Sequence, residues 1–375
     1  MKVLHIYKDF YPPIVGGIEG HINILARGLA KNKIDVSVLV SNTRNRIEKI
    51  SFDGIQVIKA PEFGRIASAP INPNFPMLLK SFVRETDLFH FHLPNPTAVI
   101  SWVISGIQKP YVASYHSDIV RQKRLYFFFK PFEKYFFSKV SRIIVASPRY
   151  LETSKILQKY KSKSSIIPYG ISIDRFNKVD HRCVKGIKNQ FKKPIILFIG
   201  KFRYYKGLPV LLESMQNVDA ILVIIGSGNR ELKEKYKCRD KAVFLGELND
   251  NAVNAYLHAC DILVLPSVKR SEAFGIVLLE AMACGKAVIS TELGTGTSYV
   301  NLHYQTGIVV PANNRFELSE AMNKILRNAD LRRSFGNNGR ERVKKYFTDK
   351  KMISDTIDLY KSILDPRNTP PAKQA

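Results

Sequence analysis

The fold of this 375-residue chain is decided by residues 271–285, which read Ser271-Glu272-Ala273-Phe274-Gly275-Ile276-Val277-Leu278-Leu279-Glu280-Ala281-Met282-Ala283-Cys284-Gly285. An apolar run at residues 261–267 comes directly before them and predicts a buried strand. Apolar residues then recur at helical spacing until Gly285, so the stretch predicts a loop that enters a helix. Glu272 lies before that helix and Glu280 about two turns into it, so the two carboxylates do not share one face.

The start of this predicted helix is suited to bind a phosphate. The backbone N–H groups of Gly275, Ile276 and Val277 would be free there, at the positive end of the helix dipole. One carboxylate could then bind sugar hydroxyls and the other ribose hydroxyls, on either side of a diphosphate. The spacing by itself is a weak signal and favours an ordinary amphipathic helix with a solvated Glu at each end.

The residues around the two carboxylates resemble a known signature. Two Glu eight positions apart, with Phe274-Gly275 between them and Glu-Ala-Met-Ala-Cys-Gly-Lys at residues 280–286, resemble the family 4 retaining glycosyltransferases. The resemblance implies the α/β GT-B fold, in which two Rossmann-like domains face a cleft. It implies an acceptor domain over residues 1–175, to which a helix at 350–364 returns, and a nucleotide-sugar domain over residues 190–345.

A basic loop opens the second half of the chain. A strand at residues 194–200 ends in Gly200 and is followed by Lys201, Arg203 and Lys206, before a helix begins at Leu208. Point charges together with oriented amides are what a diphosphate requires. In the family this loop reads Gly-Arg and then Lys-Gly, so Lys206 matches directly. Lys201 stands at the usual Arg position and Arg203 lies two residues further on, so either of these two could bind the diphosphate. The alternative for the whole loop is a solvated loop that binds no ligand.

The first half of the chain alternates between predicted strands and helices. A strand at residues 2–7 leads through Gly16-Gly17 into a helix that ends near Lys31. Two glycines let the backbone approach a ligand at a helix start, although a plain turn explains them as well. The pattern predicts a parallel sheet covered on both faces, with further strands at residues 35–40, 55–58, 88–92, 111–116 and 143–147. Residues 176–193 are charged and predict an irregular link between the domains.

Histidines end two of these strands, where ligands bind in open α/β sheets. His90, His92 and His116 suggest a metal at first sight, but no carboxylate accompanies them at the spacing of metal ligands and no Asp-x-Asp occurs, so we expect no metal. The resemblance implies that His116 contacts the donor sugar. A buried histidine with a structural role is the alternative.

A basic aromatic segment spans residues 121–139, where Phe and Tyr alternate with Lys and Arg. Such a helix suits the headgroup region of an anionic membrane. Alternatively, its aromatic residues face the core and its lysines face water, and both descriptions can hold for different residues.

Composition limits the partners. The chain carries 58 Lys and Arg against 32 Asp and Glu, a net charge of +26, which favours an anionic partner. Four widely spaced cysteines predict neither a zinc site nor a disulfide framework and fit a reducing cytoplasm. The first residues lack the apolar segment of a signal peptide, and no run of 18 apolar residues predicts a membrane-spanning helix.

Taken together, the motifs predict an enzyme. The resemblance implies a retaining hexosyltransferase that uses no metal cofactor and binds a nucleotide sugar as substrate, with GDP-mannose as first choice and a UDP-sugar as second. Its acceptor would be a lipid-linked glycan or polysaccharide of lipopolysaccharide O-antigen synthesis, on the cytoplasmic face of the cell membrane. Its implied catalytic residues are His116, Arg203, Lys206 and Glu272, and its implied donor-binding residues are Gly16, Gly17, Gly200, Lys201, Leu245, Phe274, Gly275, Ile276, Val277 and Glu280. The alternatives are a GT-B sugar-nucleotide epimerase and a non-enzymatic anion-binding protein; no nucleic-acid motif is present.

Overall fold

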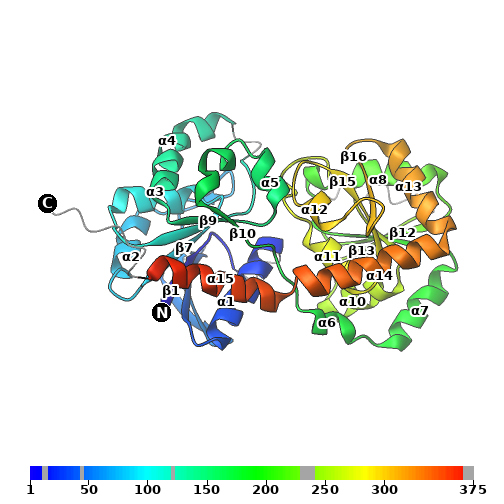
Figure 1. The fold of residues 1–375 in the computed structure, drawn as a ribbon, viewed down its shortest axis with the longest axis horizontal. Helices are drawn as coiled ribbons and strands as arrows, with labels where there is room; N and C mark the ends of the chain where they lie inside the picture. Colours follow the sequence, from blue (N-terminus) through cyan, green and yellow to red (C-terminus); the bar gives the residue numbers. More distant parts are fainter. Residues whose placement is uncertain (11–15, 43–45, 120–122, 229–240, 366–375) are drawn as a thin grey trace. The chain divides into compact units, whose positions relative to one another are not determined.

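The computed structural model describes residues 1–10, 16–42, 46–119, 123–228 and 241–365 (Figure 1). Its contacts divide the chain into two compact units. Unit 1 comprises residues 1–146, 154–170 and 349–375, and unit 2 comprises residues 147–153 and 171–348. The final helix therefore belongs to the first unit, and the segment 147–153 belongs to the second. Among the described residues, no helix has an 18-residue stretch apolar enough to cross a bilayer.

Unit 1 is an eight-stranded sheet in the order β10-β9-β8-β7-β1-β2-β4-β3. All pairs are parallel except β3 with β4. Its strands are β1 (Lys2–Ile6), β2 (Asp35–Asn42), β3 (Glu48–Phe52), β4 (Ile55–Pro61), β7 (Leu88–Leu93), β8 (Tyr111–Tyr115), β9 (Arg142–Val145) and β10 (Ser164–Ile166), and β5 (Arg65–Ile66) pairs with β6 (Ala69–Pro70) apart from the sheet. Its helices are α1 (Gly17–Lys31), α2 (Phe75–Ser81), α3 (Pro96–Ser105), α4 (Lys123–Lys139), the 3-10 helix η1 (Leu157–Lys163) and α15 (Asp349–Leu364).

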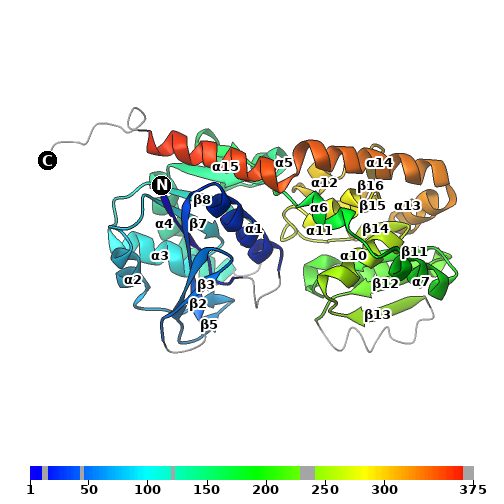
Figure 2. The ribbon, with the colours of Figure 1, turned by 90° about the horizontal axis from the view of Figure 1, so that it is seen from below.

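Helices cover both faces of this sheet. On one face α1 and α15 pack together over a core that includes Val36, Val57 and Val112 (Figures 1 and 2). On the other face the rings of Phe89 and Phe91 contact Trp102 of α3. The strict alternation of strand and helix is wrong between β2 and β4, because the chain returns there through the antiparallel strand β3 without a helix.

Unit 2 is a parallel six-stranded sheet in the order β13-β12-β11-β14-β15-β16. The strands are β11 (Ile195–Ile199), β12 (Ile221–Ile225), β13 (Ala242–Gly246), β14 (Ile262–Leu265), β15 (Ala287–Glu292) and β16 (Gly307–Pro311). The helices are α5 (Pro148–Thr153), α6 (Ile173–Asn177), α7 (His181–Phe191), η2 (Tyr204–Lys206), α8 (Leu208–Ser214), η3 (Met215–Asn217), α10 (Asp250–Ala259), α11 (Ile276–Ala283), α12 (Thr297–Val300), α13 (Arg315–Arg327) and α14 (Ala329–Tyr346).

The link predicted as irregular at residues 176–193 is helical instead. It contains the end of α6 and all of α7, and α7 packs on α10. Asp180 caps α7 by accepting a hydrogen bond from the N–H of Arg182, and this local bond stabilises the start of the helix. The helix was not predicted because its sequence is charged and shows little apolar periodicity. These residues therefore lie in unit 2 rather than between two domains.

The two sheets share one topological feature. In unit 2 the strand order reverses beside β11, whose neighbours are β12 and β14, and in unit 1 it reverses beside β1, whose neighbours are β2 and β7. In open α/β sheets, ligands bind at the carboxyl ends of the strands at such a switch point. The residues after β11 and β14 in unit 2, and those near the ends of β1 and β7 in unit 1, are therefore the candidate sites.

Candidate active site

The switch point of unit 2 holds a buried ion pair. Lys206, at the end of η2 after β11, places its Nζ 2.6 Å from Oε2 of Glu272 in the loop after β14. Ser267, directly after β14, donates to the same oxygen at 3.1 Å. Burial alone would lower the pKa of Lys206, but the Glu272 carboxylate outweighs it and the pKa is raised, so the ammonium stays charged.

Glycines let the loops of this site approach one another closely. Gly207 has φ +69°, and a Cβ there would lie 1.9 Å from the carbonyl oxygen of Pro266. A Cβ on Gly226 would lie 2.2 Å from the carbonyl oxygen of Gly200. The loops after β11, β12 and β14 therefore meet backbone to backbone, which brings Lys206 to Glu272.

The predicted phosphate position is the start of α11. Gly275 is its N-cap residue, with φ +84°, and no side chain caps the helix among the described residues. Ile276 and Val277 are half-buried in the first turn. The predicted loop and helix are confirmed, and the amides of the first turn lie in the segment next to Glu272.

Glu280 lies farther along α11 than the ion pair. Its half-buried carboxyl faces the charge of Arg175 on α6, which is paired with Asp250 at 3.1 Å. Burial raises the pKa of Glu280 to about 7, and the opposing charge of Arg175 moderates this rise. This carboxyl therefore titrates near neutral pH.

The other two cations of the basic loop have no ion pair among the described residues. Lys201 is half-buried and Arg203 is exposed. The loop is held by backbone bonds instead, since the N–H of Phe202 donates to the carbonyl of Ser227 at 2.7 Å. Both cations therefore remain candidates for binding an anion. Leu245 is half-buried in the edge strand β13, where the ring of Phe244 contacts that of Phe202.

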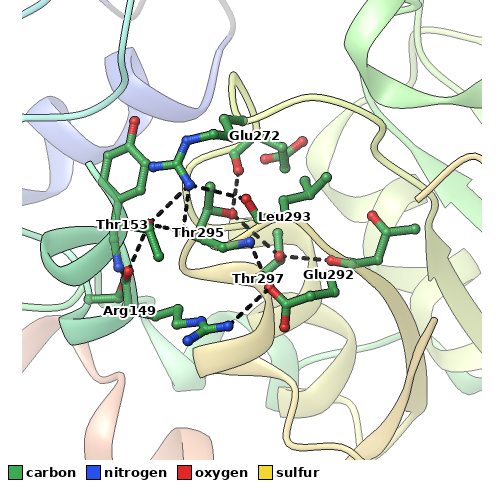
Figure 3. A network of polar contacts seen from close by, with 12 residues as sticks. Arg149, Thr153, Glu272, Glu292, Leu293, Thr295 and Thr297 are labelled. Carbon is green, nitrogen blue, oxygen red and sulfur yellow. Dashed lines mark hydrogen bonds and ion pairs between the residues drawn. The ribbon is translucent and has the colours of Figure 1, made fainter. Parts of the chain in front are cut away.

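A network of polar contacts joins the Glu272 loop to the loop that follows β15 (Figure 3). Thr295 donates to the carbonyl of Glu272 at 2.8 Å, and the N–H of Gly296 donates to the carbonyl of Ala273 at 2.7 Å. Arg270 donates to Oγ1 of Thr153 at 3.0 Å and to the carbonyl of Gly294 at 2.9 Å. The spacing of residues assigned no role to Arg270 or Ser267. Arg270 contacts Thr153, which is 117 residues away, and Ser267 contacts Glu272 within a short turn that has no distinctive sequence.

The structure also places three further predicted site residues, Phe274, Gly16 and Gly17. The side chain of Phe274 is buried and contacts Phe347, because an aromatic ring at this position fills the core. Only its backbone can face a ligand. Gly16 caps α1 without left-handed strain, and Gly17 begins the helix. A Cβ on Gly16 would lie 2.1 Å from Oε2 of Glu19, so a carboxylate of the protein already lies at this helix start.

His116 lies in unit 1, directly after β8, and is buried. Its Nε2 is 2.9 Å from Nδ1 of His92, and its Nδ1 is 2.5 Å from the hydroxyl of Tyr169. Burial lowers its pKa well below the ordinary value, so the ring is neutral. A ligand can reach a ring nitrogen of His116 only by replacing one of these partners.

One group of side chains could hold a metal ion among the residues described. The ring nitrogens of His5, His90 and His92 lie within 4.8 Å of one another, and all three side chains are buried. No carboxylate belongs to the group. These rings lie in the core of unit 1, in the layer that also contains His116.

The exposed face of α4 in unit 1 is apolar and basic. Phe127 and Phe128 are 73% and 74% exposed, whereas Phe136 and Phe137 are fully buried. Arg124, Lys130, Lys134 and Lys139 are all exposed. The core-facing reading is therefore confirmed for Phe136 and Phe137. The membrane reading stays a prediction for the exposed residues of the same helix, and residues 121 and 122 lie outside the described part.

The chain resembles known proteins along its whole length. The family model described as Glycosyltransferase Family 4 matches residues 15–175, and that described as Glycosyl transferases group 1 matches residues 184–342. O-antigen chain mannosyltransferase C of Escherichia coli is 33% identical over 372 residues, which cover 98% of this chain and all of the relative. D-rhamnosyltransferase WbpZ of Pseudomonas aeruginosa is 34% identical over 354 residues, which cover 93% of this chain and 92% of the relative.

Solved structures share the fold at lower identity. Sucrose-phosphate synthase from Thermosynechococcus elongatus has a TM-score of 0.81 at 21% identity, over 96% of this chain and 98% of that one. HepE of Anabaena in complex with UDP-glucose has a TM-score of 0.77 at 16% identity, over 96% of this chain and 100% of that one.

Proposed function

Since the chain belongs to the family 4 glycosyltransferases and has the GT-B fold, we propose that it transfers a hexose from a nucleotide sugar with retention of configuration. The observation that carries this proposal is the Lys206–Glu272 pair at the switch point of unit 2. It combines a cation for a diphosphate and a carboxylate for sugar hydroxyls, next to the uncapped start of α11.

The proposed catalysis is electrostatic. Negative charge develops on the diphosphate as the sugar leaves, and Lys206 together with the amides of Gly275, Ile276 and Val277 stabilises it. Arg203 or Lys201 adds a second cation from the same loop. The leaving diphosphate then helps to deprotonate the acceptor hydroxyl on the same face of the sugar, so no side chain has to act as nucleophile.

The two carboxylates of the motif take different parts of the donor. Glu272 is fixed by Lys206 and Ser267 and orients hydroxyls of the sugar. Glu280, two turns into α11, accepts from the ribose hydroxyls, for which its ionised form is the better acceptor. The base lies along β13 near Leu245, and Gly200 gives the diphosphate room beside Lys201. As the family resemblance implies, the neutral ring of His116 contacts the sugar.

GDP-mannose is our first choice of donor. The Escherichia coli relative is named a mannosyltransferase of the O-antigen chain, and the Pseudomonas aeruginosa relative a D-rhamnosyltransferase. A UDP-sugar is the second choice, because the HepE structure contains UDP-glucose. The acceptor is a lipid-linked glycan or polysaccharide of O-antigen synthesis.

We propose that transfer needs no metal. The cations around the predicted diphosphate position are protein side chains, led by Lys206, and they supply the charge that a divalent ion would otherwise contribute.

We propose that the enzyme acts at the cytoplasmic face of the cell membrane. The exposed rings of Phe127 and Phe128 lie on α4 among exposed cations, which suits an anionic lipid surface. A lipid-linked acceptor would lie at the same surface.

The experiment is a donor screen with the purified full chain. Release of nucleoside diphosphate is measured across GDP- and UDP-sugars, with and without a short lipid-linked mannosyl acceptor and with EDTA present. We expect GDP-mannose to give the fastest acceptor-dependent release and EDTA to leave it unchanged. Interconversion of the sugar without transfer would indicate the epimerase, and no turnover of any donor would refute the proposal.

A further inference from the structure

Five histidines form one polar layer inside unit 1. His5 on β1 lies opposite His90 on β7 in the strand register, and alternation along β7 places His92 on the same face. His116 follows β8 on that face, and His21 of α1 covers the layer with its ring 5.5 Å from that of His116. All five side chains are buried.

Three of these rings are joined in a row that ends at a tyrosine. Nδ1 of His5 is 3.0 Å from Nε2 of His92, and Nδ1 of His92 is 2.9 Å from Nε2 of His116. Nδ1 of His116 is 2.5 Å from the Tyr169 hydroxyl. The planes of the His92 and His116 rings are nearly parallel, with 2° between them and 5.2 Å between their centroids, as for two rings joined edge to edge by this bond. These hydrogen bonds fix both the position and the rotation of each ring.

His90 is not hydrogen-bonded to this row, although its ring packs on that of His92 with 4.3 Å between the centroids. Its Nδ1 is 2.5 Å from the hydroxyl of Tyr360 on α15, and its Nε2 is 2.7 Å from Oγ of Ser114. The hydrogen bonds of His5, His90 and His92 thus engage five of their six ring nitrogens, all except Nε2 of His5. A neutral hydrogen-bonded network therefore accounts for the cluster without a metal ion.

The protons of the row have a preferred direction. Burial lowers the pKa of His5 to about 3 and that of His92 well below its ordinary value, so each ring carries one proton. Nε2 of His5 is buried and has no partner among the described residues. Buried N–H groups without a partner are rarer in proteins than buried acceptors without one, which favours the proton of His5 on Nδ1. The bonds then require His92 and His116 to carry their protons on Nδ1 as well.

We propose that His5 and His92 are positioning residues that hold His116 as a neutral ring with its proton on Nδ1. The inference rests on the proposed role of His116 at the donor sugar. A sugar hydroxyl that replaces the Tyr169 oxygen would then meet an N–H donor and would accept the hydrogen bond. The row thereby selects the direction of one contact between protein and sugar.

Two substitutions of His92 separate this role from simple packing. The amide nitrogen of Asn can take the place of Nδ1 and still donate to His116, whereas the longer Gln can reach only the place of Nε2 and its bond to His5. We expect His92→Gln to lower kcat for transfer at least tenfold more than His92→Asn, with Kd for the free nucleoside diphosphate unchanged in both. Equal losses in the two variants would overturn the proposal.

His90→Gln is the matched control, since His90 lies on the same strand and face, is equally buried and is outside the row. His90→Gln should lower the melting temperature as much as the His92 variants do. It should leave kcat within about threefold of the unaltered protein, which is a small effect because a tenfold change corresponds to about 1.4 kcal/mol. A loss of kcat as large as that of His92→Gln would show that any disturbance of the layer acts on the reaction.

The proton positions can be observed without activity. Long-range ¹H–¹⁵N spectra of histidine-labelled full chain distinguish a protonated Nδ1 from a protonated Nε2, and His5, His92 and His116 should all be of the Nδ1 type. A protonated Nε2 on His116, or stoichiometric zinc in the purified protein, would overturn the proposal. If the spectra agree but no nucleotide sugar is turned over, the proposed function fails while the proton row stands.

Discussion

The switch points of the two units have the same topology and opposite chemistry. In unit 2 the loops beside β11 hold the ion pair of Lys206 and Glu272. In unit 1 the core beside β1 holds His5 and His92, whose pKa values are lowered by burial so that the rings are neutral. Topology thus fixes where polar groups gather, and residue type decides what they can bind. Charge suits a diphosphate, whereas neutral donors and acceptors suit sugar hydroxyls.

The largest expected effect is loss of the cation in unit 2. Lys206→Met should lower turnover about 10²–10³-fold, the loss found when one preorganised donor to developing negative charge is removed. Steady-state release of nucleoside diphosphate measures it. Turnover within threefold of the unaltered protein would remove the charged half of the comparison.

Stability provides the control for this variant. Lys206→Met leaves the buried Glu272 carboxylate without its cation, so the melting temperature should fall. Adding Glu272→Gln removes the unpaired charge and should restore the melting temperature while turnover stays low. A double variant that recovered turnover would show that the single variant merely misfolds.

The next effect concerns α4, the charged surface of unit 1. Reversing Arg124, Lys130 and Lys134 to Glu should weaken binding to anionic vesicles about 100-fold or more, since each cation near the surface contributes about 1 kcal/mol. Turnover of a short soluble acceptor should be unchanged, because these side chains are not among those proposed to bind the donor. Co-sedimentation with vesicles measures the binding.

The matched control reverses Arg182, Lys185 and Lys188 on α7, which are also exposed but have no exposed aromatic rings beside them. Each set removes three positive and adds three negative charges, so both change the net charge from +26 to +20. Equal losses in the two sets would mean that net charge alone acts, and unaltered binding in the α4 set would end the membrane proposal.

A smaller effect is expected from Glu272→Gln, which keeps an acceptor and removes the charge. Transfer should fall about 10–100-fold, as for loss of a hydrogen bond to a charged group, while Kd for the free nucleoside diphosphate changes little because its partner is the sugar. Calorimetric titration beside kinetics separates the two. A parallel loss of both would assign Glu272 to the diphosphate.

The smallest effect is a pH dependence of stability. The pKa of Glu280 is raised to about 7 in the folded chain, so between pH 4.5 and 7 the folded state binds more protons here than the unfolded state. This group therefore makes stability fall as pH rises through that window. The measured quantity is the melting temperature of Glu280→Gln minus that of the unaltered protein. This difference should be a few degrees larger at pH 8 than at pH 5, at about 2–4 °C per kcal/mol. The buried histidines titrate in both proteins, so their contribution cancels from the difference. An identical difference at both pH values would contradict the raised pKa.

The sequence predicted those features whose signal is local. Glu272, Glu280 and the helix start at Gly275 lie within one short stretch, and the cations of the basic loop lie within six residues, so the spacing together with the residues around it was enough to find them. The helix α7 was missed because its charged sequence shows few apolar residues, and none of its side chains is fully buried.

Long-range contacts could not be read from spacing. His5 and Tyr169 join His92 and His116 only because β1, β7, β8 and the segment after β10 meet in one layer. His116 was expected at a ligand, and its two partners are separated from it by 24 and 53 residues. Arg270 likewise reaches Thr153 over 117 residues.

The most direct test of the contrast between the two switch points is a hydrogen-exchange footprint of the full chain with saturating free nucleoside diphosphate, GDP and then UDP. The account predicts protection of the backbone amides in residues 200–207 and 271–285 of unit 2, and no protection of peptides that span β7 and β8 in unit 1. The diphosphate of the nucleotide is negatively charged, and among the described residues of the two switch points only those of unit 2 offer a cation and free helix amides to bind it. Protection confined to unit 1, or none in residues 271–285 with either nucleotide, would contradict it.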